Sequence, residues 1–387
     1  EDAKMESINT ILEAAKYKEE GKCKALIVTG CLTQRYKNEI TKEIPEIDAI
    51  LGTGNFDKIV PTLNKVLSGD KIIQIENPDF DYRSDLPRKL TNNHYSYIKI
   101  AEGCNNNCSY CAIPEIRGKV KSRSIEDIYN EIKQLSNYGI KEIILIAQDI
   151  TQYGIDIYQK PTLSSLLDEI VAIDNIEWIR LLYSYPERIS DKLISLIKNE
   201  AKICNYLDLP IQHSSDKIRK YMGRKGTKKE ILNLIQYLRT EINDITLRTS
   251  LIVGFPGETE KDFQDLKNFV KTVEFDRLGV FKYSQEEGTA AAKFSNQISP
   301  EVKEERYNEI MQLQQKISLK KNQKMIGKKI EVLIDEIFED YSLGRSQYDS
   351  PEIDNQIIIH DTKLNPGDII KCKITDAYEY DLIGEKI

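Results

Sequence analysis

The sequence predicts an α/β protein in three parts: an α/β domain, a partial barrel of six β/α units, and a small all-β barrel at the carboxyl end. Between residues 94 and 323, six short apolar segments alternate with helical segments, which is the pattern of parallel strands joined by right-handed crossovers. An apolar run, a glycine turn and a helical segment precede this region. Strand-like segments joined by turns follow it.

The composition is that of an ordinary globular protein. The 387 residues are enough for two or three domains, and 40% are hydrophobic while 30% are charged. No apolar run approaches the roughly 20 residues that a membrane span needs, and no signal peptide is evident, so we expect no membrane association. Seven cysteines in a chain of this length do not resemble an extracellular disulfide scaffold. We therefore expect a cytoplasmic protein.

Residues 1–74 predict a partial α/β domain. The segment "KALIVTG" is a short apolar run of the buried-strand type, and Cys31 follows it directly. The segment "DAILGTGNFDKIVPTLNKVL" predicts a strand, a glycine loop and then a helix. Residues 75–93 are polar, contain proline and lack periodicity, so they predict a linker.

Residues 94–323 predict the six-unit barrel. The segment "SIEDIYNEIKQLSNYG" shows helical periodicity between Ser124, a candidate N-cap, and Gly139, which closes the helix. Six units are fewer than the eight of a closed barrel, so the barrel is expected to be partial. The six expected strands cover residues 95–100, 142–147, 178–183, 203–209, 245–253 and 276–283.

The last part of the chain predicts one long exposed helix from Pro300, followed by a small β-barrel or sandwich over residues 324–387. From Glu331 onward, 14 acidic side chains face 5 basic ones, a net charge of −9 within a total of −7. Such a surface suits a basic protein partner better than a nucleic acid backbone. On charge alone, a merely solvated acidic surface is an equal alternative.

Three of the seven cysteines lie within eight residues, in the segment "AEGCNNNCSYCAIPEIRG". Cys104, Cys108 and Cys111 have the spacing C-x3-C-x2-C and follow the first barrel strand. Four thiolates would close a structural zinc site or saturate a cubane cluster. Three can hold a [4Fe–4S] cluster and leave one iron open to another ligand. A zinc site with three cysteines and one histidine, or an unrelated cysteine cluster, is the alternative.

This spacing after the first strand of a six-unit barrel resembles the radical S-adenosylmethionine superfamily. There, the open iron binds the cofactor, whose cleavage yields a 5′-deoxyadenosyl radical. Several longer segments resemble the methylthiotransferase family, and its RimO branch rather than the tRNA-modifying MiaB branch. These segments are "HYSYIKIAEGCNNNCSYCAIPEIRG", "EIILIAQDITQYGIDIY", "RLLYSYPERI", "YLDLPIQHSSDKIRKYMGR", "LRTSLIVGFPGETEKDF", "FDRLGVFKYSQEEGTAA" and "GRSQYDSPEID".

The resemblance implies a partial radical S-adenosylmethionine barrel, preceded by a methylthiotransferase α/β domain and followed by a TRAM-like β-barrel. It also implies an activity: a methylthio group is added to the β-carbon of an aspartate in the small-subunit ribosomal protein numbered twelve, met free or on the ribosome. The radical abstracts a β-hydrogen, and the carbon then takes a methylsulfanyl group from a second [4Fe–4S] cluster. A base such as His213 could not activate this unacidic C–H bond, so no catalytic acid or base is assigned.

In this family, three cysteines of the N-terminal domain hold the second cluster. One lies in a "TGC" turn, which "VTGCLTQR" matches at Cys31. The other two are expected upstream of Glu1, which suggests an N-terminal truncation, although a misplaced gene start or an inability to donate sulfur would leave the same pattern. Cys23 lies nearby in a polar segment and is a weak candidate. The expected metal ligands are therefore Cys104, Cys108, Cys111 and Cys31.

Four residues are expected to contact S-adenosylmethionine. Tyr110 lies between two of the thiols, and Gln148 follows the second strand. Gly254, in "LIVGFPGETE", follows the fifth strand and allows close backbone approach, although such turns also merely end strands. Phe281 closes the sixth strand and could border the adenine together with Tyr283, with core packing as the alternative for Phe281.

The remaining polar and thiol residues have two interpretations each. Asp149 could bind the cofactor or cap a helix. His213 could contact substrate or be a satisfied structural histidine. The basic residues Arg117, Lys121 and Arg123 could meet an acidic substrate group or form a solvated loop. Cys204 and Cys372 fall in apolar strands and are expected to be buried.

Charge separates the competing functions. The TRAM module is often associated with RNA, but a charge of −9 opposes phosphate binding, so direct nucleic acid binding is not expected. The very basic ribosomal protein is the better electrostatic partner. The alternatives are a tRNA adenosine methylthiotransferase of the MiaB type, and a non-catalytic iron–sulfur fragment that binds the ribosome.

Overall fold

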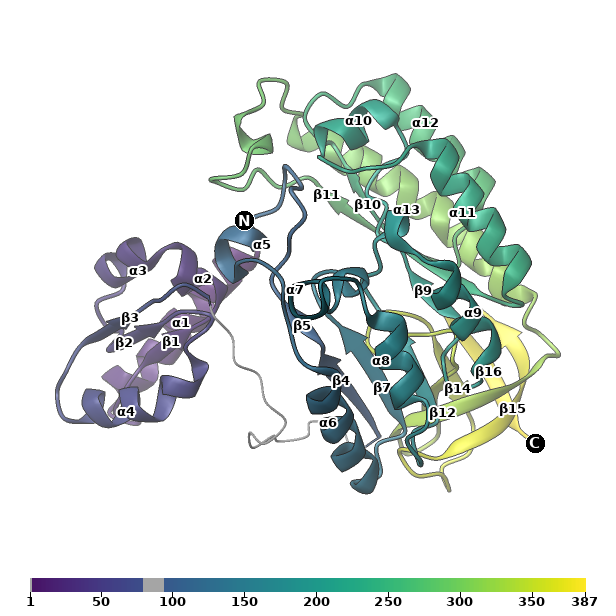
Figure 1. Ribbon diagram of the computed structural model, residues 1–387, viewed down its shortest axis with the longest axis horizontal. Helices are drawn as coiled ribbons and strands as arrows, with labels where there is room; N and C mark the ends of the chain where they lie inside the picture. Colours follow the sequence, from purple (N-terminus) through teal and green to yellow (C-terminus); the bar gives the residue numbers. More distant parts are fainter. Residues whose placement is uncertain (1, 79–93) are drawn as a thin grey trace. The chain divides into compact units, whose positions relative to one another are not determined.

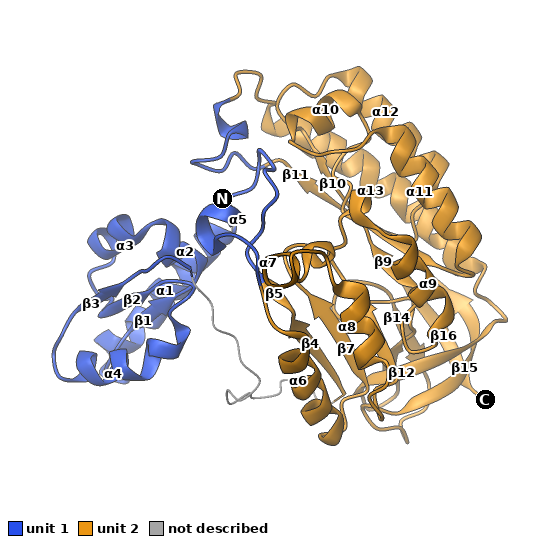
Figure 2. Ribbon diagram, viewed as in Figure 1, with its two compact units in different colours: residues 1–83, 102–121, 284–293 blue, residues 84–101, 122–283, 294–387 orange. Residues whose placement is uncertain are grey.

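The computed structural model describes residues 2–78 and 94–387, and the chain divides into two compact units (Figures 1 and 2). Much of the predicted linker at 75–93 lies outside the described residues. The segment that carries the three clustered thiols belongs to unit 1, together with the N-terminal part of the chain. Unit 1 comprises Glu1–Arg83, Glu102–Lys121 and Ser284–Lys293, and unit 2 comprises Ser84–Ala101, Ser122–Tyr283 and Phe294–Ile387.

Unit 1 contains a three-stranded parallel sheet in the order β1-β2-β3. The predicted apolar run forms β1, and the second predicted segment forms β2, a glycine turn and α4, as expected. Ile50 in the middle strand is fully buried and packs with apolar side chains of α1 and α3. The elements of this unit are α1 (Asp2–Glu19), β1 (Ile27–Thr29), α2 (Cys31–Arg35), α3 (Lys37–Glu43), β2 (Ala49–Leu51), η1 (Phe56–Lys58), α4 (Ile59–Leu67), β3 (Ile72–Gln74), α5 (Ile113–Arg117) and η4 (Ala291–Lys293).

Unit 2 begins with the six predicted parallel strands. They form two three-stranded sheets, β4-β7-β8 and β9-β10-β11. A parallel bridge between Ile179 and Ile203 joins β8 to the segment that leads into β9, so the strands follow one another in chain order. The strands are β4 (Tyr95–Lys99), β7 (Glu142–Ile146), β8 (Trp178–Leu181), β9 (Tyr206–Asp208), β10 (Thr246–Val253) and β11 (Arg277–Lys282).

No pairing closes β11 onto β4 in the part of the chain that the structure describes, so the barrel is partial, as predicted. The short strand pair of β5 (Ala101–Glu102) and β6 (Lys121–Ser122) lies where the chain passes between the two units. Strand β7 is buried along almost its whole length, which is typical of a parallel strand that helices cover.

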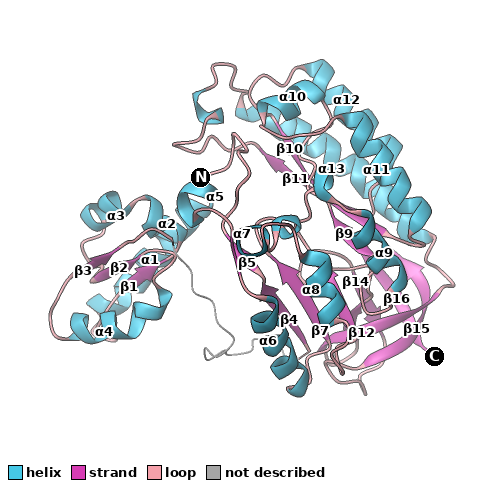
Figure 3. Ribbon diagram, in the orientation of Figure 1, coloured by secondary structure: helices cyan, strands magenta, loops and turns pink. Residues whose placement is uncertain are grey.

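Helices connect the barrel strands (Figure 3). Side-chain caps define where several of these amphipathic helices begin. Ser124 accepts a hydrogen bond from the backbone of Asp127 at 3.1 Å, and Gly139 follows the helix with a φ of 88°, both as predicted. The helical elements are α6 (Ile125–Asn137), η2 (Ile150–Gln152), α7 (Ile155–Tyr158), α8 (Leu163–Ile170), η3 (Pro186–Arg188), α9 (Asp191–Asn199), α10 (Asp216–Tyr221), α11 (Lys228–Glu241), α12 (Glu260–Val273) and α13 (Pro300–Gln323).

The long helix α13 exists as predicted, but the expectation that it is exposed is wrong. One face of it is buried and packs against β11 and β15. Because this face is largely polar, the hydrophobic pattern of the sequence does not predict that it is buried. Its buried residues are Arg306, Ile310, Gln314, Ile317, Ser318 and Asn322.

The last five strands close into a small barrel in the order β12-β13-β14-β16-β15. Its core is apolar and includes Val332, Ile334, Ile357 and Ile374. The small β-barrel predicted over residues 324–387 is thus present. The strands are β12 (Lys329–Ile337), β13 (Ser342–Arg345), β14 (Gln356–Ile359), β15 (Ile369–Ala377) and β16 (Asp381–Lys386).

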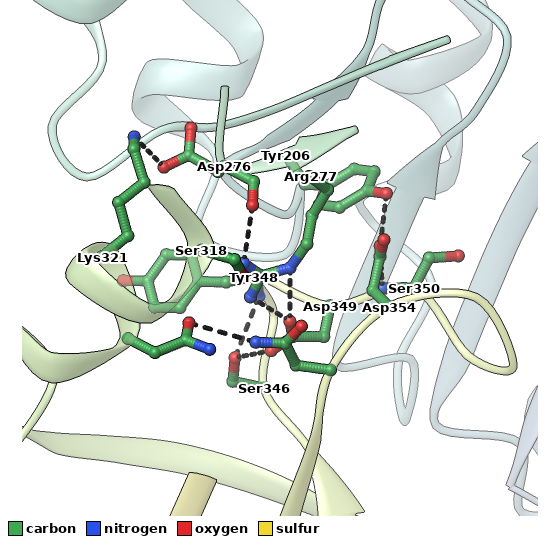
Figure 4. Close-up of polar contacts among 12 residues, drawn as sticks. Tyr206, Asp276, Arg277, Ser318, Lys321, Ser346, Tyr348, Asp349, Ser350 and Asp354 are labelled. Carbon is green, nitrogen blue, oxygen red and sulfur yellow. Dashed lines mark hydrogen bonds and ion pairs between the residues drawn. The ribbon is translucent and has the colours of Figure 1, made fainter. Parts of the chain in front are cut away.

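Within unit 2, buried ion pairs join the six-stranded barrel to the terminal barrel (Figure 4). The Nε of Arg277 on β11 donates to Asp349 at 3.1 Å, and the Asp349 side chain is only 1% exposed. The hydroxyl of Tyr206 on β9 donates to Asp354 at 2.6 Å. Arg277 with Asp349 and Tyr206 with Asp354 thus each pair buried polar groups across the junction, which offsets part of the cost of their burial.

None of the helices in the described residues is both long enough and apolar enough to cross a membrane. The longest, α13, carries many charged side chains. This agrees with the absence of any long apolar run in the sequence.

Candidate active site

The loop with three cysteines follows β4 and β5 in the chain and is closed at its base. The backbone N–H of Cys104 donates to the carbonyl of Gly118 at 3.1 Å. Gly103 has a φ of 72°, and a Cβ there would clash with the carbonyl of Lys119, so the backbone approaches too closely for any other residue. The thirteen residues between Cys104 and Gly118 thus form a loop that a backbone hydrogen bond closes at its base.

The three thiols are partly accessible. Cys104, Cys108 and Cys111 are half-buried, and none forms a disulfide. The backbone N–H of Asn106 donates to the sulfur of Cys104 at 3.4 Å, a contact that stabilises a thiolate. The backbone N–H of Cys111 donates to the carbonyl of Cys108 at 3.1 Å and turns the loop between these two thiols.

Burial raises the pKa of Cys111 to about 11, and the negative charges of Cys108 and Cys104 add to this rise. A bound metal centre reverses this effect, because it deprotonates coordinating thiols. Three thiols in one loop are therefore suited to share a positively charged inorganic centre.

Among residues 2–78 and 94–387, no group of three or more Cys, His, Asp or Glu side chains is arranged to hold a single metal ion. Ligands of a four-iron cluster stand further apart than ligands of one ion, because each sulfur binds a different iron. The donor set of Cys104, Cys108 and Cys111 consists only of thiols, which are the ligands that iron–sulfur clusters take. The residues present thus fit such a cluster.

Cys31 lies in the same unit as the thiol loop. It is the first residue of α2, is half-buried, and lines a cavity of about 200 Å³ together with Arg35 and Ile116. Arg117, the last residue of α5, donates from Nη2 to the sulfur of Cys31 at 3.4 Å and from Nη1 to Glu102 at 2.7 Å. Helix α5 is therefore the segment that connects the thiol loop to Cys31.

Cys23 takes part in neither group. Its sulfur donates to the carbonyl of Ala25 at 3.1 Å, in the turn that follows α1. Cys204 and Cys372 are 1% and 0% exposed, and burial raises the pKa of their thiols to about 12 and about 11. Both are small buried hydrophobes, as predicted.

Three of the expected cofactor contacts lie in unit 2, at the carboxyl ends of parallel strands. Gln148, after β7, is exposed. Gly254, after β10, is buried and has a φ of 70° that favours glycine. Phe281, near the end of β11, is 57% exposed, so the alternative that it packs in the core is wrong. Tyr283 is the buried member of this pair, at 4%. Tyr110 lies in unit 1 and is half-buried.

Asp149, the neighbour of Gln148, acts as a cap. Its carboxylate accepts from the backbone of Thr151 at 3.0 Å, from the side chain of Gln152 at 2.8 Å and from Arg188 at 2.6 Å. All these partners belong to the loops after β7 and β8. Of its two predicted roles, the structure therefore supports capping.

The turn after β10 rests on a buried polar group that the sequence did not reveal. Glu258 is 2% exposed and accepts hydrogen bonds from the backbone N–H groups of Gly254 and Phe255. Its other oxygen lies 3.7 Å from Nε2 of His213, whose Nδ1 accepts from the backbone of Ser215 at 2.9 Å. His213 is fully buried, which favours a structural role, but its Nε2 makes no hydrogen bond to the described residues, so the ring is satisfied at only one nitrogen. In the sequence, the only sign of this role is that Glu258 follows Gly254 by four residues.

The predicted basic cluster does not present three free cations. Arg117 is engaged with Glu102 and Cys31, and Arg123 is 9% exposed and pairs with Asp127 and Glu131. Burial lowers the pKa of Arg117, but the charges of Glu102 and Cys31 raise it by more, so the net shift is upward. Arg123 thus has a structural role, and Arg117 contacts the sulfur of Cys31.

Three family models match the chain. The radical SAM superfamily matches residues 98–270, the TRAM domain matches residues 326–387, and a family described as "Uncharacterized protein family UPF0004" matches residues 1–52. The first of these ranges contains the thiol loop and the strands from β7 to β10, and the second contains the terminal barrel.

Curated relatives match almost the whole chain. A protein of Clostridium botulinum (strain Okra, type B1) named ribosomal protein uS12 methylthiotransferase RimO is 54% identical over 386 residues, which cover 99% of this chain and 87% of the relative. A protein of the same name from Desulforamulus reducens is 52% identical over 391 residues, covering 100% and 88%.

Solved structures show the same fold at low identity. The radical S-adenosylmethionine methyltransferase TsrM from Kitasatospora setae, solved with tryptophan and a cofactor analogue, is 16% identical with a TM-score of 0.51, and covers 66% of this chain and 55% of that chain. The cobalamin-dependent radical enzyme OxsB is 10% identical with a TM-score of 0.51 and covers 79% and 45%.

Proposed function

We propose that this chain, which belongs to the RimO family of ribosomal protein uS12 methylthiotransferases, adds a methylthio group to the β-carbon of an aspartate in uS12. The observation that carries this proposal is an identity of 51% to 54% over at least 99% of the chain with several proteins of that name. Membership of the radical SAM superfamily implies a [4Fe–4S] cluster and S-adenosylmethionine as cofactors. Modification of a ribosomal protein also suits a cytoplasmic location.

We assign the cluster ligands to Cys104, Cys108 and Cys111. A backbone hydrogen bond from Cys104 to Gly118 closes the base of their loop, and the N–H of Asn106 already points at one sulfur. When bound, the cluster and S-adenosylmethionine together supply a radical that can abstract hydrogen from an unactivated carbon. This matches the problem that the substrate sets, because a β-hydrogen of aspartate is not acidic enough for a general base.

We assign the binding of S-adenosylmethionine to Gln148, Gly254, Phe281 and Tyr110. Gln148 offers an exposed amide to the polar end of the cofactor. The turn at Gly254 lets the backbone approach a ligand, and Glu258 holds that turn in place. Phe281 offers an exposed aromatic face on which adenine can stack.

We propose that Cys31 is one ligand of a second cluster, the source of the methylsulfanyl group. It is half-buried, lies in the unit that contains the thiol loop, and lines a cavity. Its sulfur is free of any disulfide and already faces a hydrogen-bond donor. These are the properties of a thiolate that a protein prepares for an inorganic centre.

We propose that the terminal barrel contributes to recognition of uS12. It carries 14 acidic side chains against 5 basic ones from Glu331 onward. A ribosomal protein is basic, because it binds RNA, so opposite charges would steer it toward this surface. The same charge would repel tRNA, which argues against the adenosine-modifying branch of the family.

The test is to reconstitute the protein, expressed from its complete reading frame, with iron and sulfide under anaerobic conditions, and to incubate it with uS12, S-adenosylmethionine and a reductant. Mass spectrometry should show one methylthio group on an aspartate of uS12. Cys104→Ala should abolish product, because it removes a cluster ligand, whereas Cys23→Ala should retain activity within about twofold, as expected of a site outside the machinery. Unmodified uS12 beside methylthiolated tRNA would overturn the proposal.

A further inference from the structure

Tyr183, two residues after the end of β8, has a backbone conformation that a tyrosine rarely adopts. Its φ is 63°, in the left-handed region, where the Cβ of a bulky residue crowds the backbone. The side chain is 45% exposed, whereas Leu182 and Ser184 on either side are buried. None of the hydrogen bonds found in the described part of the chain involves the hydroxyl of Tyr183. A strained residue therefore presents an accessible phenol at the carboxyl end of a barrel strand.

Two neighbouring segments hold Tyr183 in this conformation. Its backbone N–H donates to one carboxylate oxygen of Asp208 at 3.0 Å, and its carbonyl accepts from the N–H of Ile150 at 3.1 Å. Asp208 is fully buried, and its other oxygen accepts from Arg248 at 3.0 Å, so the buried charge is paired. A strained backbone persists only where its surroundings over-determine it, and such residues cluster at functional sites. The bonds from β9 and from the loop after β7 therefore point to a function for Tyr183.

Tyr183 lies at the edge of the barrel to which we assign the cofactor. Its bond to Ile150 joins it to the loop that also carries Gln148, one of the assigned contacts. The other assigned contacts in unit 2 lie at the ends of β10 and β11, so β8 and β9 are left without one. Strand β9 is likewise followed by a strained residue, the half-buried Gln212, whose φ is 70°. Because the ends of several strands build the active site of a barrel, the ends of β8 and β9 are available to the substrate.

We infer that Tyr183 binds the substrate: its hydroxyl donates a hydrogen bond to the carboxylate of the aspartate that receives the methylthio group. The inference rests on the proposed function. In that aspartate the carboxylate is bonded directly to the β-carbon, so a donor that holds the carboxylate also fixes the position of the β-hydrogens. An ionised carboxylate only accepts hydrogen bonds, and a neutral phenol can donate to it throughout the reaction without a transfer of its proton.

Two other roles of Tyr183 predict different results. A ring that packs against the cofactor would contribute to the binding of S-adenosylmethionine, so its loss would weaken that binding. A ring that only stabilises the fold would act through its apolar surface, which phenylalanine retains. A donor to the substrate carboxylate predicts a third result, in which the cofactor still binds and is still cleaved, but cleavage is coupled less well to the modification of uS12.

The experiment uses the protein expressed from its complete reading frame and reconstituted anaerobically, with uS12 that carries deuterium on the β-carbon of its aspartates. Mass spectrometry measures methylthiolated uS12, 5′-deoxyadenosine and the deuterium that the latter contains. For Tyr183→Phe we expect kcat/KM for uS12 to fall about tenfold, as for one lost hydrogen bond to a charged group. The 5′-deoxyadenosine released per methylthiolated uS12 should rise several-fold, and its deuterium content should fall. The dissociation constant of S-adenosylmethionine and the midpoint of urea unfolding should stay unchanged.

Two further variants control for strain and for the loss of the ring. Tyr183→Gly adopts the same φ without strain, so the turn is kept while the ring is lost, and we expect at least the loss of activity seen for Tyr183→Phe. Asp244→Gly is the matched control for strain. Asp244 is exposed, has a φ of 53° and precedes β10, at the opposite end of the strand, so its replacement should leave kcat/KM for uS12 within about twofold.

The outcomes separate this inference from the proposed function. If the unaltered protein does not modify uS12, the proposed function fails and the inference fails with it. If it does, but Tyr183→Phe has the same kcat/KM and the same coupling, the role of Tyr183 is overturned and the function stands. Weaker binding of S-adenosylmethionine by Tyr183→Phe would assign the ring to the cofactor and likewise overturn the inference. Should Tyr183→Gly fail to fold, Tyr183→Phe, which keeps the ring, still decides the question.

Discussion

At the residue scale, Asp149 shows how a single buried carboxylate shapes the cofactor edge of the barrel. It is 4% exposed, and four donors from two loops converge on it, two of them from Thr151. Its neighbour Gln148 is exposed. The hydrogen bonds of Asp149 thus hold its side chain inside the protein. The side chain of Gln148, one residue earlier, is thereby turned outward, where it is available to a ligand.

Replacement of Asp149 by Ala should lower the free energy of unfolding by about 2 kcal/mol, because four donors, one of them charged, lose their acceptor. The same variant should bind S-adenosylmethionine more weakly, with unchanged iron content, because the loop that carries Gln148 loses its anchor. Urea unfolding of the apoprotein and equilibrium binding of the cofactor measure the two effects. Asp174→Ala, at an exposed aspartate, should change neither. Equal stability of the two variants would contradict the capping role.

Arg117 marks the limit of sequence analysis at this scale. Arg117 and Cys31 are separated by 86 positions, so no local pattern links them. The sequence suggested a cationic loop for an acidic substrate, whereas the structure gives Arg117 a carboxylate and a thiol as partners. Such pairings depend on tertiary packing, here of α5 against α2, which residue spacing does not encode.

At the element scale, the start of α12 secures the turn after β10. Thr259 and Asp262 form a reciprocal capping box, and Asp262 also accepts from Ser215 at 2.7 Å and pairs with Lys217 at 3.2 Å. Helix α12 is thereby joined to the segment that follows β9. Because Gly254 lies just before this helix, the cap fixes one end of the turn that we assign to the cofactor.

Asp262 should make stability depend on pH. Burial raises the pKa of its carboxyl, but hydrogen bonds from Thr259, Ser215 and Lys217 lower it by more, so it lies below the usual 3.8. A carboxyl with a depressed pKa in the folded state stabilises the fold above its unfolded pKa and loses this contribution as pH falls. Asp262→Asn should cost about 1 kcal/mol at pH 7.

The difference in the free energy of unfolding between Asp262→Asn and the unaltered protein should shrink as the pH falls below about 4. At this pH the carboxyl of the unfolded protein takes up a proton. Urea unfolding of the apoprotein at a series of pH values measures the gap. Glu126→Gln, at an exposed residue in the first turn of α6, is a control in which no comparable narrowing is expected. A gap that stays constant from pH 7 to the acid limit would contradict the assignment.

Most elements could be predicted from the sequence because their signals are local. The buried strands are runs of isoleucine and leucine, and the caps at Ser124 and Gly139 are short patterns. Strand β13, with the sequence SLGR, has a weaker signal, because it has one large apolar residue and a glycine. The buried face of α13 was not predicted, because arginine, glutamine, serine and asparagine contribute to it. Only the tertiary partners of these residues show that they are buried.

At the scale of the whole molecule, the three-part architecture followed from changes in periodicity, and the family models match the corresponding regions. The junction of the two barrels in unit 2 could not be predicted. It depends on pairs such as Arg277 with Asp349 and Tyr206 with Asp354, whose members come from different domains (Figure 4). Asp349 and Asp354 of the negatively charged terminal barrel thus pair with residues of the core barrel and are not available to a partner.

The acidic residues that remain exposed should recruit the basic substrate. Glu336, Glu339 and Asp340 lie at and after the end of β12 and are exposed. Changing all three to the neutral amides should raise the KM for uS12 several-fold at low salt and leave the maximal rate unchanged, because charges at the rim of an interface act mainly on encounter. The effect should fade at about 1 M salt, where the screening length falls to about 3 Å.

Steady-state methylthiolation of uS12 across a salt series measures this effect. The matched control neutralises three exposed acidic residues of the core barrel, Glu126, Asp174 and Glu177, so that the total charge of the two variants is equal. If net charge alone attracted the substrate, both variants would lose affinity to the same extent. A larger loss in the variant of the terminal barrel locates the docking surface there, because screened interactions act only over about 10 Å at 0.1 M salt. Equal losses would assign the attraction to the whole molecule and contradict a dedicated role of the terminal barrel.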